Sequence, residues 1–455
     1  MYVRDTIAAI STPVGEGGIG IVRVSGPASL PIARSIFRAK SNGGLKSHRF
    51  SYGVVLHPAT GELLDEAMLV FMKGPNSYTR EDVLEIQCHG GTLVVSRILS
   101  LVLSEGARLA EPGEFTKRAF LNGRIDLVQA EAVMDVIASR TDASLALAQH
   151  QREGLLSRRI SAVKESILYA LAFVEALIDF PEDDIDVAVE TDVLGRVTPA
   201  LLELTSLIDG FDEGRVLRDG VSVVIAGKPN VGKSSLLNTL LKEKRAIVTA
   251  VPGTTRDVIE EVVNINGLPV KLLDTAGIRD SDDLVEQEGV RLSLDRIPKA
   301  DLVLFVIDGA SPFTGEDEAI LRAIGSKSLI VVRNKSDLPA CAVLPPEPVL
   351  PTVSISTVTG DGVADLRAAI AAAFIHGTAI DGREFVAVSS ARHRDALLKA
   401  RQSLDAFVAN LQAGVNMEIL PIDLRDALDA VGEVTGETTA DDVLDRIFSS
   451  FCIGK

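Results

Sequence analysis

The chain has 455 residues, of which 46% are hydrophobic and 24% are charged, and its formal net charge is −17. This composition indicates a globular protein of several domains, and no apolar run reaches the roughly 18 residues of a membrane-spanning helix. An acidic chain is poorly suited to sequence-independent nucleic-acid binding, so an RNA partner would need a local basic surface or a second protein. One candidate basic surface comprises Arg392, His393, Arg394, Lys399 and Arg401. The same residues could equally form a solvated helix face.

The cysteine pattern points to a reducing compartment. Cys88, Cys341 and Cys452 are far apart and odd in number, which argues against a disulfide framework and against a zinc site. The first residues also lack the apolar core of a signal peptide. We therefore expect a cytoplasmic protein with no membrane attachment.

Short apolar runs alternate with turns marked by glycine and proline over residues 1–120. The clearest predicted strands span residues 19–24, 66–71 and 83–87. This pattern is typical of an α+β domain, which we assign to residues 1–120.

Helical periodicity begins after this domain. Apolar residues recur at helical spacing over residues 127–138 and 155–178. An acidic segment at 181–186 interrupts the pattern before helix resumes to residue 208. We expect residues 121–215 to form the first part of a helical domain.

A second change of pattern marks an α/β domain. A buried strand at 221–226 is followed by a glycine-rich turn and a helix at 234–241. Alternating strands and helices predict a mostly parallel, doubly wound sheet over residues 216–377, and residues 378–455 are again helical. The simplest architecture inserts the α/β domain between two halves of one helical domain. Further strands are expected at 270–273, 302–307 and 329–332.

The glycine-rich turn has the sequence GKPNVGKS at residues 227–234. Between a strand and a helix, such a loop points its backbone N–H groups at the phosphates of a nucleotide. Lys233 would supply positive charge there, and the Ser234 hydroxyl would bind Mg²⁺. The turn therefore predicts a nucleotide-binding P-loop.

Two later segments fit switch loops that respond to a γ-phosphate. Thr255 can close over Mg²⁺ and the γ-phosphate. Asp274 ends a strand and can hold the metal's second shell, while Gly277 offers a backbone N–H to the γ-phosphate. Because these contacts vanish on hydrolysis, both loops should order with GTP and relax with GDP.

The segment Asn334-Lys335-Ser336-Asp337 fits a guanine-recognition motif. The Asp337 carboxylate can accept hydrogen bonds from guanine N1–H and N2–H₂, which adenine cannot supply. Ser356 should close the base loop, although Thr357 stands where such loops usually carry alanine. Together the motifs predict a Ras-like P-loop domain that binds and hydrolyses GTP. Its predicted nucleotide-binding residues are Asn230, Gly232, Lys233, Ser234, Ser235, Thr249, Thr254, Thr255, Asp274, Thr275, Gly277, Asn334, Lys335, Asp337 and Ser356.

The chain lacks the glutamine that usually positions the attacking water in GTP hydrolysis. Signalling GTPases place glutamine directly after the Asp-x-x-Gly motif, but this chain has Ile278 there. Asn230 could instead bind a monovalent cation near the bridging phosphate oxygen, with the electrostatic effect of an arginine finger. Arg279 and Glu286 could orient the water, although both could also be solvated charges.

With these residues identified, the chain closely resembles the tRNA-modification GTPase family known as MnmE or TrmE. The resemblance covers the whole length and includes segments that have no nucleotide role. These segments are residues 5–7, 17–23, 74–77, 89–91, 112–115, 119–123, 179–182 and 451–455.

The resemblance implies an N-terminal tetrahydrofolate-binding domain, a helical domain split around the GTPase domain, and homodimerisation through the N-terminal domains. It also implies a heterotetramer with the FAD- and NADH-dependent protein MnmG, also called GidA. Such complexes add an aminomethyl or carboxymethylaminomethyl group to C5 of the wobble uridine of certain tRNAs. The expected folate ligand is 5-formyl- or 5,10-methylene-tetrahydrofolate.

The resemblance further assigns roles to residues by position. Glu286 matches a water-orienting residue, with Arg279 nearby, and Arg124 stands where the family often has lysine. The implied folate residues are Arg23, Glu81, Arg124 and Lys455. The implied metal ligands are Ser234 and Thr255 for Mg²⁺, and Asn230, Thr249, Val251 and Thr254 for K⁺.

Cys452 lies in the C-terminal sequence Phe-Cys-Ile-Gly-Lys. The family motif suggests a catalytic thiol, whose thiolate a nearby cation would favour. A small apolar residue packed in a helical domain is equally consistent with the sequence.

Two other functions are open from the sequence. A ribosome-assembly GTPase would share the P-loop and Ile278, but such proteins usually carry an RNA-binding module whose Gly-x-x-Gly clamp or basic β-platform we do not find here. A GTP-gated interaction switch would have no further chemistry. We expect the tRNA-modification function, because the resemblance spans regions with no nucleotide role.

Overall fold

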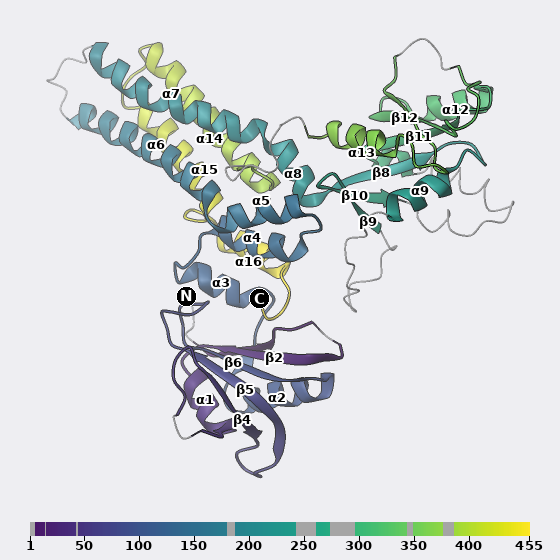
Figure 1. The fold of residues 1–455 in the computed structure, drawn as a ribbon. Coiled ribbons are helices and arrows are strands. Elements are labelled where there is room, and N and C mark those ends of the chain that lie inside the picture. Colours follow the sequence, from purple (N-terminus) through teal and green to yellow (C-terminus); the bar gives the residue numbers. More distant parts are fainter. Residues whose placement is uncertain are drawn as a thin grey trace. The chain divides into compact units, whose positions relative to one another are not determined.

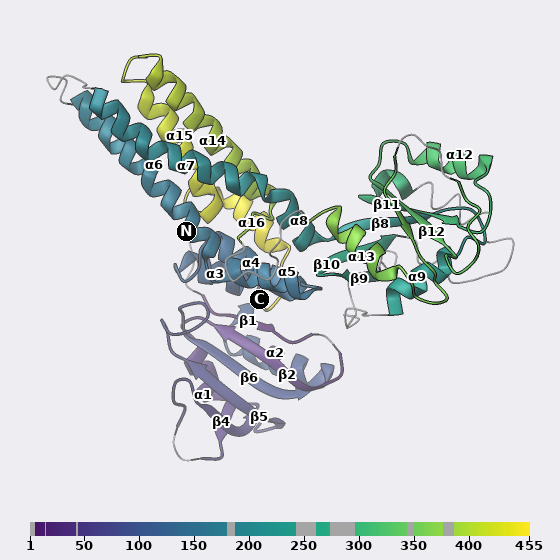
Figure 2. The ribbon, with the colours of Figure 1, turned by 45° about the horizontal axis from the view of Figure 1, so that its top comes forward.

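The computed structural model describes residues 5–13, 15–41, 44–179, 187–242, 261–273, 296–343, 349–375 and 386–455 (Figures 1 and 2). The chain divides into two compact units. One, here called the N-terminal unit, lies within residues 1–134 and 432–455. The other, called the central unit, comprises the described residues between 135 and 431.

The N-terminal unit is built on a seven-stranded sheet with strand order β3-β4-β5-β6-β2-β1-β7. Neighbouring strands are antiparallel, except that β1 and β7 are parallel. The strands predicted at 19–24, 66–71 and 83–87 correspond to β2, β5 and β6 and are confirmed. The strands are Ile7–Ile10 (β1), Gly17–Ser25 (β2), Phe37–Ala39 (β3), Phe50–Leu56 (β4), Leu63–Met72 (β5), Val83–Gly90 (β6) and Arg108–Leu109 (β7).

Two helices cover one face of this sheet. Helices α1 (Ser29–Ile36) and α2 (Thr92–Ser104) bury Ile32 and Ile98 against inward-facing strand residues such as Leu69. Because side chains alternate along a strand, β4 and β5 place every second residue on the other face. That face carries exposed aromatic side chains at its β4 end.

Helices α3 (Glu114–Leu121), α4 (Leu127–Ala138) and α16 (Asp441–Ser449) form a second layer. The ring centroids of Phe120 and Phe448 lie 6.4 Å apart. Gly113, in a left-handed conformation with φ 66°, packs so closely that a Cβ there would lie 2.6 Å from the Phe448 carbonyl oxygen. The glycine therefore lets the chain before α3 contact the end of α16.

The central unit begins with a helical bundle in which α6 packs on α7 and α7 on α14 (Figures 1 and 2). Its helices before and after the α/β domain are joined by the buried Gln151 side chain, which donates to the Ala387 carbonyl (3.0 Å) and the Ser389 hydroxyl (3.1 Å). In the described part of the chain, no helix is long and apolar enough to cross a membrane. The bundle helices are Asp142–Arg152 (α5), Leu155–Asp179 (α6), Val187–Asp209 (α7), Phe211–Asp219 (α8), Ala391–Gln412 (α14) and Leu420–Thr435 (α15).

The rest of the central unit is a six-stranded sheet with order β13-β12-β11-β8-β10-β9. All pairs are parallel except β9 with β10. The predicted strands correspond to β8, β10, β11 and β12, whereas β9 and β13 were not predicted. The strands are Val221–Ala226 (β8), Glu261–Ile265 (β9), Leu268–Leu273 (β10), Leu302–Asp308 (β11), Leu329–Asn334 (β12) and Thr352–Ser354 (β13).

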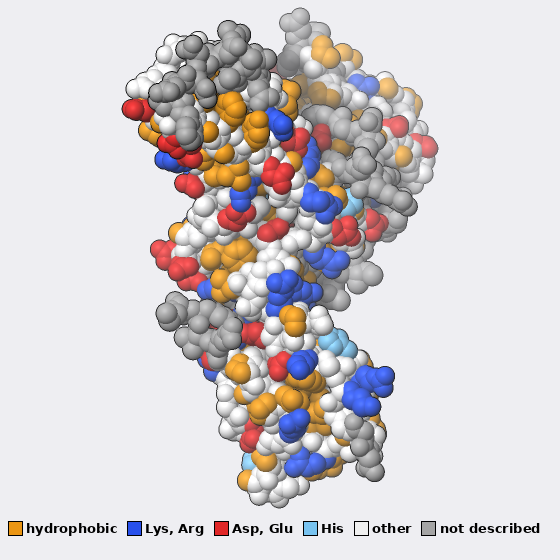
Figure 3. Space-filling view, turned by 90° about the vertical axis from the view of Figure 1, so that its left-hand side faces the viewer, with side chains coloured by type: hydrophobic (Ala, Val, Ile, Leu, Met, Phe, Trp, Pro, Cys, Tyr) orange, Lys and Arg blue, Asp and Glu red, His pale blue; other side chains and the backbone are white. Residues whose placement is uncertain are grey.

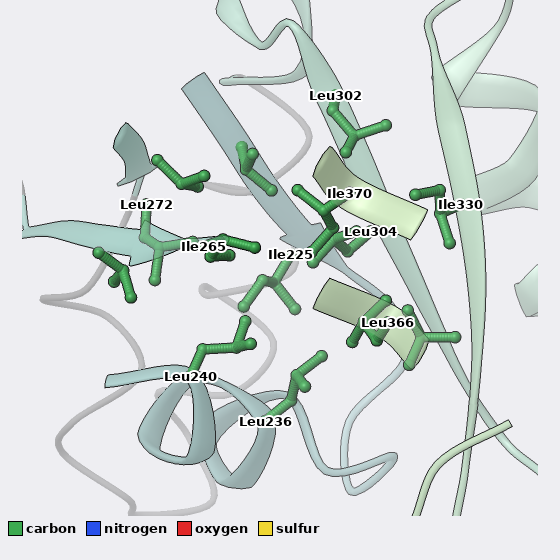
Figure 4. Close-up of a cluster of buried hydrophobic side chains, with 14 of the residues drawn as sticks. Ile225, Leu236, Leu240, Ile265, Leu272, Leu302, Leu304, Ile330, Leu366 and Ile370 are labelled. Atoms are coloured by element: carbon green, nitrogen blue, oxygen red, sulfur yellow. The ribbon is translucent and has the colours of Figure 1, made fainter. Parts of the chain in front are cut away.

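Both faces of this sheet are buried, which explains the continuous apolar runs of its strands. On one face, Ile225 and Leu304 pack with α9 (Lys233–Lys242) and α13 (Val363–Ala372), as Figure 4 shows. On the other face, Phe305 packs with α12 (Gly315–Ile324). The predicted fold class, a helical domain with an inserted Ras-like α/β domain after an N-terminal α+β domain, is confirmed.

A buried arginine links three parts of the N-terminal unit. Arg118 of α3 is 1% exposed, and its guanidinium donates to Asp5 Oδ1 at 2.5 Å and to Glu114 Oε1 at 2.9 Å. It also donates to Glu81 Oε2 at 3.1 Å. Burial alone would raise the pKa values of Asp5 and Glu114, but hydrogen bonds from Arg108 and Arg118 hold both pKa values below their ordinary range.

These lowered pKa values predict an acid-sensitive N-terminal unit. A carboxyl whose pKa is depressed on folding stabilises the fold above its unfolded pKa, near 4, and loses that contribution as pH falls through the folded value. We expect hydrogen exchange in β1 and β2 to accelerate as pH drops below about 5, after correction for intrinsic exchange rates. Replacing Arg118 by methionine should cost about 1.5–3 kcal/mol at neutral pH, because Asp5, Glu81 and Glu114 lose charge-assisted hydrogen bonds while Arg108 still pairs with two of them.

A matched control is Lys40→Met, which removes an exposed ion pair with Glu66 (2.9 Å) in the same unit. It should change the exchange little, because solvent screens exposed pairs. Equal protection factors in Arg118→Met and wild type at neutral pH would refute the role of this network.

Candidate functional site

The P-loop joins β8 to α9 through backbone that side chains would obstruct. A Cβ at Gly227 would overlap the Val306 carbonyl oxygen, and one at Gly232 would overlap Asn334 Nδ2. Gly232 has φ 97° and Asn230 has φ 62°, both in the left-handed region. The loop thus follows a path that only small residues or asparagine permit, and its N–H groups precede the α9 N-terminus, where an anion is favoured.

Two lysines set the conformation of the loop. Lys233 Nζ donates to the Lys228 carbonyl oxygen at 2.6 Å. Lys228 Nζ lies 2.7 Å from Asp317 Oδ2 and 3.1 Å from the Thr314 hydroxyl, and these two residues cap α12. The Lys228 contact ties the P-loop to α12 and was not predicted, because Asp317 is far away in sequence.

The Asn334 side chain connects the phosphate side of the site to the base side. Its Nδ2 donates to the Val231 carbonyl at 2.8 Å, and its Oδ1 accepts from the Thr357 backbone N–H at 3.2 Å. Asn334 is 1% exposed, so both bonds are shielded from water. Since Thr357 contributes its backbone, its departure from the usual alanine leaves this contact intact.

Ser356 and Asp337 meet in the base loop. Ser356 Oγ donates to Asp337 Oδ1 at 2.7 Å and accepts from the Thr359 backbone N–H at 3.2 Å. Lys335, with φ 64°, pairs with Asp308 at 2.8 Å. Burial alone would raise the pKa of the Asp308 carboxyl, but hydrogen bonds from Lys335 and a backbone N–H hold that pKa below its usual value.

The remaining predicted nucleotide-site residues fall into two groups. Ser234 and Ser235 lie in the first turn of α9. The residues outside the described part of the chain are Thr249, Val251, Thr254, Thr255, Asp274, Thr275, Gly277, Arg279 and Glu286.

A second cluster, in the N-terminal unit, places two of the residues that the resemblance assigns to folate at one tyrosine ring, and the other two lie in the same unit. The Arg23 guanidinium lies 5.9 Å from the Tyr78 ring centroid, and that of Arg124 lies 4.9 Å from the same ring. Arg23 Nη1 also donates to the Gly454 carbonyl at 3.2 Å, next to Lys455. Tyr78, at the centre of this cluster, was not predicted.

Glu81 is held at the edge of this cluster by two donors. Ser25 Oγ donates to Glu81 Oε2 at 2.7 Å, and Arg118 donates to the same oxygen. The Glu81 side chain is 14% exposed. The cluster therefore combines a fixed carboxylate, two guanidinium groups and an aromatic ring, a set that suits a heteroaromatic ligand with carboxylate groups.

These two sites can be compared with known proteins. The family model for the MnmE helical domain matches residues 127–452, and the model for the GTP-binding protein TrmE N-terminus matches residues 6–124. The chain is 67% identical to the tRNA modification GTPase MnmE of Geotalea uraniireducens, 64% to that of Geobacter sulfurreducens and 51% to that of Chloroflexus aurantiacus. Each alignment covers 100% of both proteins.

The chain belongs to the MnmE family. This membership confirms the resemblance seen in the sequence and the prediction that the chain is a GTP hydrolase of tRNA modification. GTP as its nucleotide is confirmed in the same way.

The structure also bears on the role of Cys452 and on the candidate basic surface at residues 392–401. Cys452 is exposed, so the alternative of a packed apolar residue is wrong. In the stretch from Arg392 to Arg401, His393 is 2% exposed, and Arg394 stacks on Phe211 at 4.6 Å and pairs with Asp395. The His393 ring is therefore not available to such a surface, and the Arg394 charge already has an anionic partner.

The P-loop geometry predicts the effect of one added methyl group. Gly232→Ala should weaken binding of a fluorescent GDP at least tenfold, because the Cβ overlaps Asn334 and the left-handed conformation disfavours alanine by about 1–2 kcal/mol. Fluorescence titration measures the dissociation constant.

Gly315→Ala is the matched control, since a Cβ at Gly315 would meet no atom within 4 Å. It should bind GDP as wild type does. If both variants bind equally well, the steric interpretation of Gly232 is wrong.

Proposed function

We propose that the chain is a potassium-stimulated GTPase that works with an FAD- and NADH-dependent partner of the MnmG (GidA) type. Together they would add an aminomethyl or carboxymethylaminomethyl group to C5 of the wobble uridine of certain tRNAs. The names of the relatives, tRNA modification GTPase, support the substrate class.

The observation that carries this proposal is the cluster around Tyr78. Arg23, Glu81, Arg124 and Lys455 come from distant parts of the sequence but lie in one compact unit, where Arg23 and Arg124 contact the same tyrosine ring. A tetrahydrofolate derivative, 5-formyl- or 5,10-methylene-tetrahydrofolate, would supply a one-carbon unit there. The Glu81 carboxylate suits the N–H donors of a pterin ring, and the cations suit the glutamyl carboxylates.

Within the nucleotide site, each residue has a proposed task. Lys233 would exchange its bond to the Lys228 carbonyl for the nucleotide phosphates, while Asp337 reads guanine. Ser234 and Thr255 would hold Mg²⁺, which neutralises charge on the phosphates. Arg279 and Glu286 would orient the attacking water.

Potassium would bind at Asn230, Thr249, Val251 and Thr254. Asn230 supports this part of the proposal, because it lies within the P-loop and its side-chain amide oxygen is of the kind that binds a monovalent cation. A monovalent cation there would stabilise charge developing between the β- and γ-phosphates.

The larger assembly is also proposed. Residues 1–120 would bind folate and form a homodimer, residues 121–215 and 378–455 would form the helical domain, and residues 216–377 would hydrolyse GTP. The homodimer would join two copies of the MnmG-type protein in a heterotetramer in the cytoplasm. Cys452, exposed next to the folate cluster, would act as a nucleophile.

Deletion of the gene tests the function directly. Mass spectrometry of tRNA nucleosides should show loss of aminomethyl-type wobble uridines, and only the wild-type gene should restore them. Add-back of Asp337→Asn, which loses guanine contacts, and of Arg23→Ala, which loses a folate-site cation, should restore less than about a tenth of the modification.

The two variants separate the roles of the two sites. Purified Arg23→Ala should hydrolyse GTP normally, whereas Asp337→Asn should not. An unchanged nucleoside profile after deletion would overturn the modification function, and ribosome assembly would become the function to test.

Potassium dependence is tested by GTPase rates in K⁺ and in Na⁺ at equal ionic strength. Wild type should be at least tenfold faster in K⁺, and Asn230→Ala should show no difference between the two ions. Equal wild-type rates in both salts would remove potassium from the proposal.

A further inference from the structure

The acidic residues of the chain are unevenly distributed. Residues 17–61 contain no aspartate or glutamate, although 63 of the 455 residues are acidic, so about six would be expected in that length. Residues 1–120 carry 13 Lys and Arg against 11 Asp and Glu, a formal charge of +2, which leaves −19 on the rest. The acid-free stretch contains Arg23, Arg34, Arg38, Lys40, Lys46 and Arg49.

The fold gathers part of this stretch at one end of the sheet. The backbone N–H of His48 donates to the Phe71 carbonyl at 2.8 Å, and that of Lys73 donates to the Ser47 hydroxyl at 3.0 Å. The segment 46–49 therefore lies against the end of β5. We call Lys46, Arg49, Phe50 and Lys73 the basic edge.

The three cations of the basic edge are not neutralised by neighbouring carboxylates in the described part of the chain. All three are exposed, and among the described residues no carboxylate lies within ion-pair distance of them. By contrast, Lys40 of the same stretch pairs with Glu66. Figure 3 shows Lys and Arg side chains spread among hydrophobic ones on the N-terminal unit.

An exposed aromatic ring completes the surface. Phe50 is 54% exposed at the start of β4, directly after Arg49. Tyr52, two residues on and on the same face, is 45% exposed, but Lys40 lies 4.5 Å from its ring centroid. Cations that meet phosphates beside an aromatic ring that stacks on a base are typical of surfaces for single-stranded nucleic acid.

We propose that the basic edge binds the sugar–phosphate backbone of the tRNA substrate and stacks an unpaired base on Phe50. The inference rests on the proposed function for its substrate. Charge favours this occupant over a second copy of the chain, because a two-fold contact would bring the same three cations against each other, whereas a polyanion pairs with them. This surface was not predicted from the sequence, because Lys73 is distant in sequence from residues 46–50.

Charge reversal tests the surface. The triple variant Lys46→Glu, Arg49→Glu and Lys73→Glu should bind fluorescent tRNA at least tenfold more weakly in anisotropy titrations at 0.15 M salt. The slope of log affinity against log salt should fall by about 2, since each lost phosphate contact on a single strand removes about 0.7.

The matched control reverses three exposed cations of the central unit, Arg158→Glu, Lys299→Glu and Arg322→Glu. Both triples have the same net charge, so a difference between them reports location. The control should lose at most about threefold in affinity. Equal losses in the two triples would overturn the proposal.

Other outcomes separate this inference from the proposed function. GTPase rate and sedimentation of the first triple should match wild type, and a change of oligomeric state would mean that the surface contacts a second copy instead. If wild type itself fails to bind tRNA alone or with its partner protein, the proposed function fails too.

The ring is tested by its own pair of variants. Phe50→Ala should weaken binding of an anticodon stem-loop RNA about fivefold or more, while Phe50→Trp should retain it, because the stack requires an aromatic face. Binding of a fully paired duplex of equal length should not change. An equal effect on stem-loop and duplex would remove the stacked base.

Discussion

The nucleotide site depends on one buried amide. Phosphates and base lie at opposite ends of a nucleotide, so a site must hold two loops at a fixed spacing. The Asn334 side chain does this by bonding the Val231 carbonyl of the P-loop and the Thr357 N–H of the base loop. Because the amide occupies that space, Gly232 must lack a side chain. A residue of the guanine motif thereby constrains the phosphate motif.

In the N-terminal unit, a buried charged side chain likewise joins separate segments of the chain. Arg118 is buried and joins the chain before β1, the loop before β6 and the start of α3 through Asp5, Glu81 and Glu114. Leaving such a cation without partners would be costly, so its carboxylates specify one arrangement of three segments. One of those carboxylates belongs to the candidate folate cluster. In both units, a buried polar residue fixes the positions of groups in a candidate ligand site.

The sequence predicted strands and motifs better than long-range contacts. Apolar runs located β8, β11 and β12, because strands buried on both faces have no polar alternation to obscure them. Strand β9 was missed, although Asn266-Gly267 between two apolar runs signals a two-residue hairpin, and both residues have positive φ. The Glu114–Arg118 spacing was visible on a helix, but its partner Asp5 and its burial depend on tertiary packing. Tyr78 was missed for the same reason.

The distribution of charge suggests how an acidic protein can act on RNA. Most of the chain is negative and repels phosphates, which suppresses binding in unproductive orientations. Only residues 1–120 carry more positive than negative charge, so in the proposed function they would attract RNA more than the rest of the chain does. With few phosphates contacted, the proposed surface would bind with modest affinity, so that a partner protein could share the substrate. This charge pattern therefore favours one orientation of the RNA on the protein more than it favours tight binding.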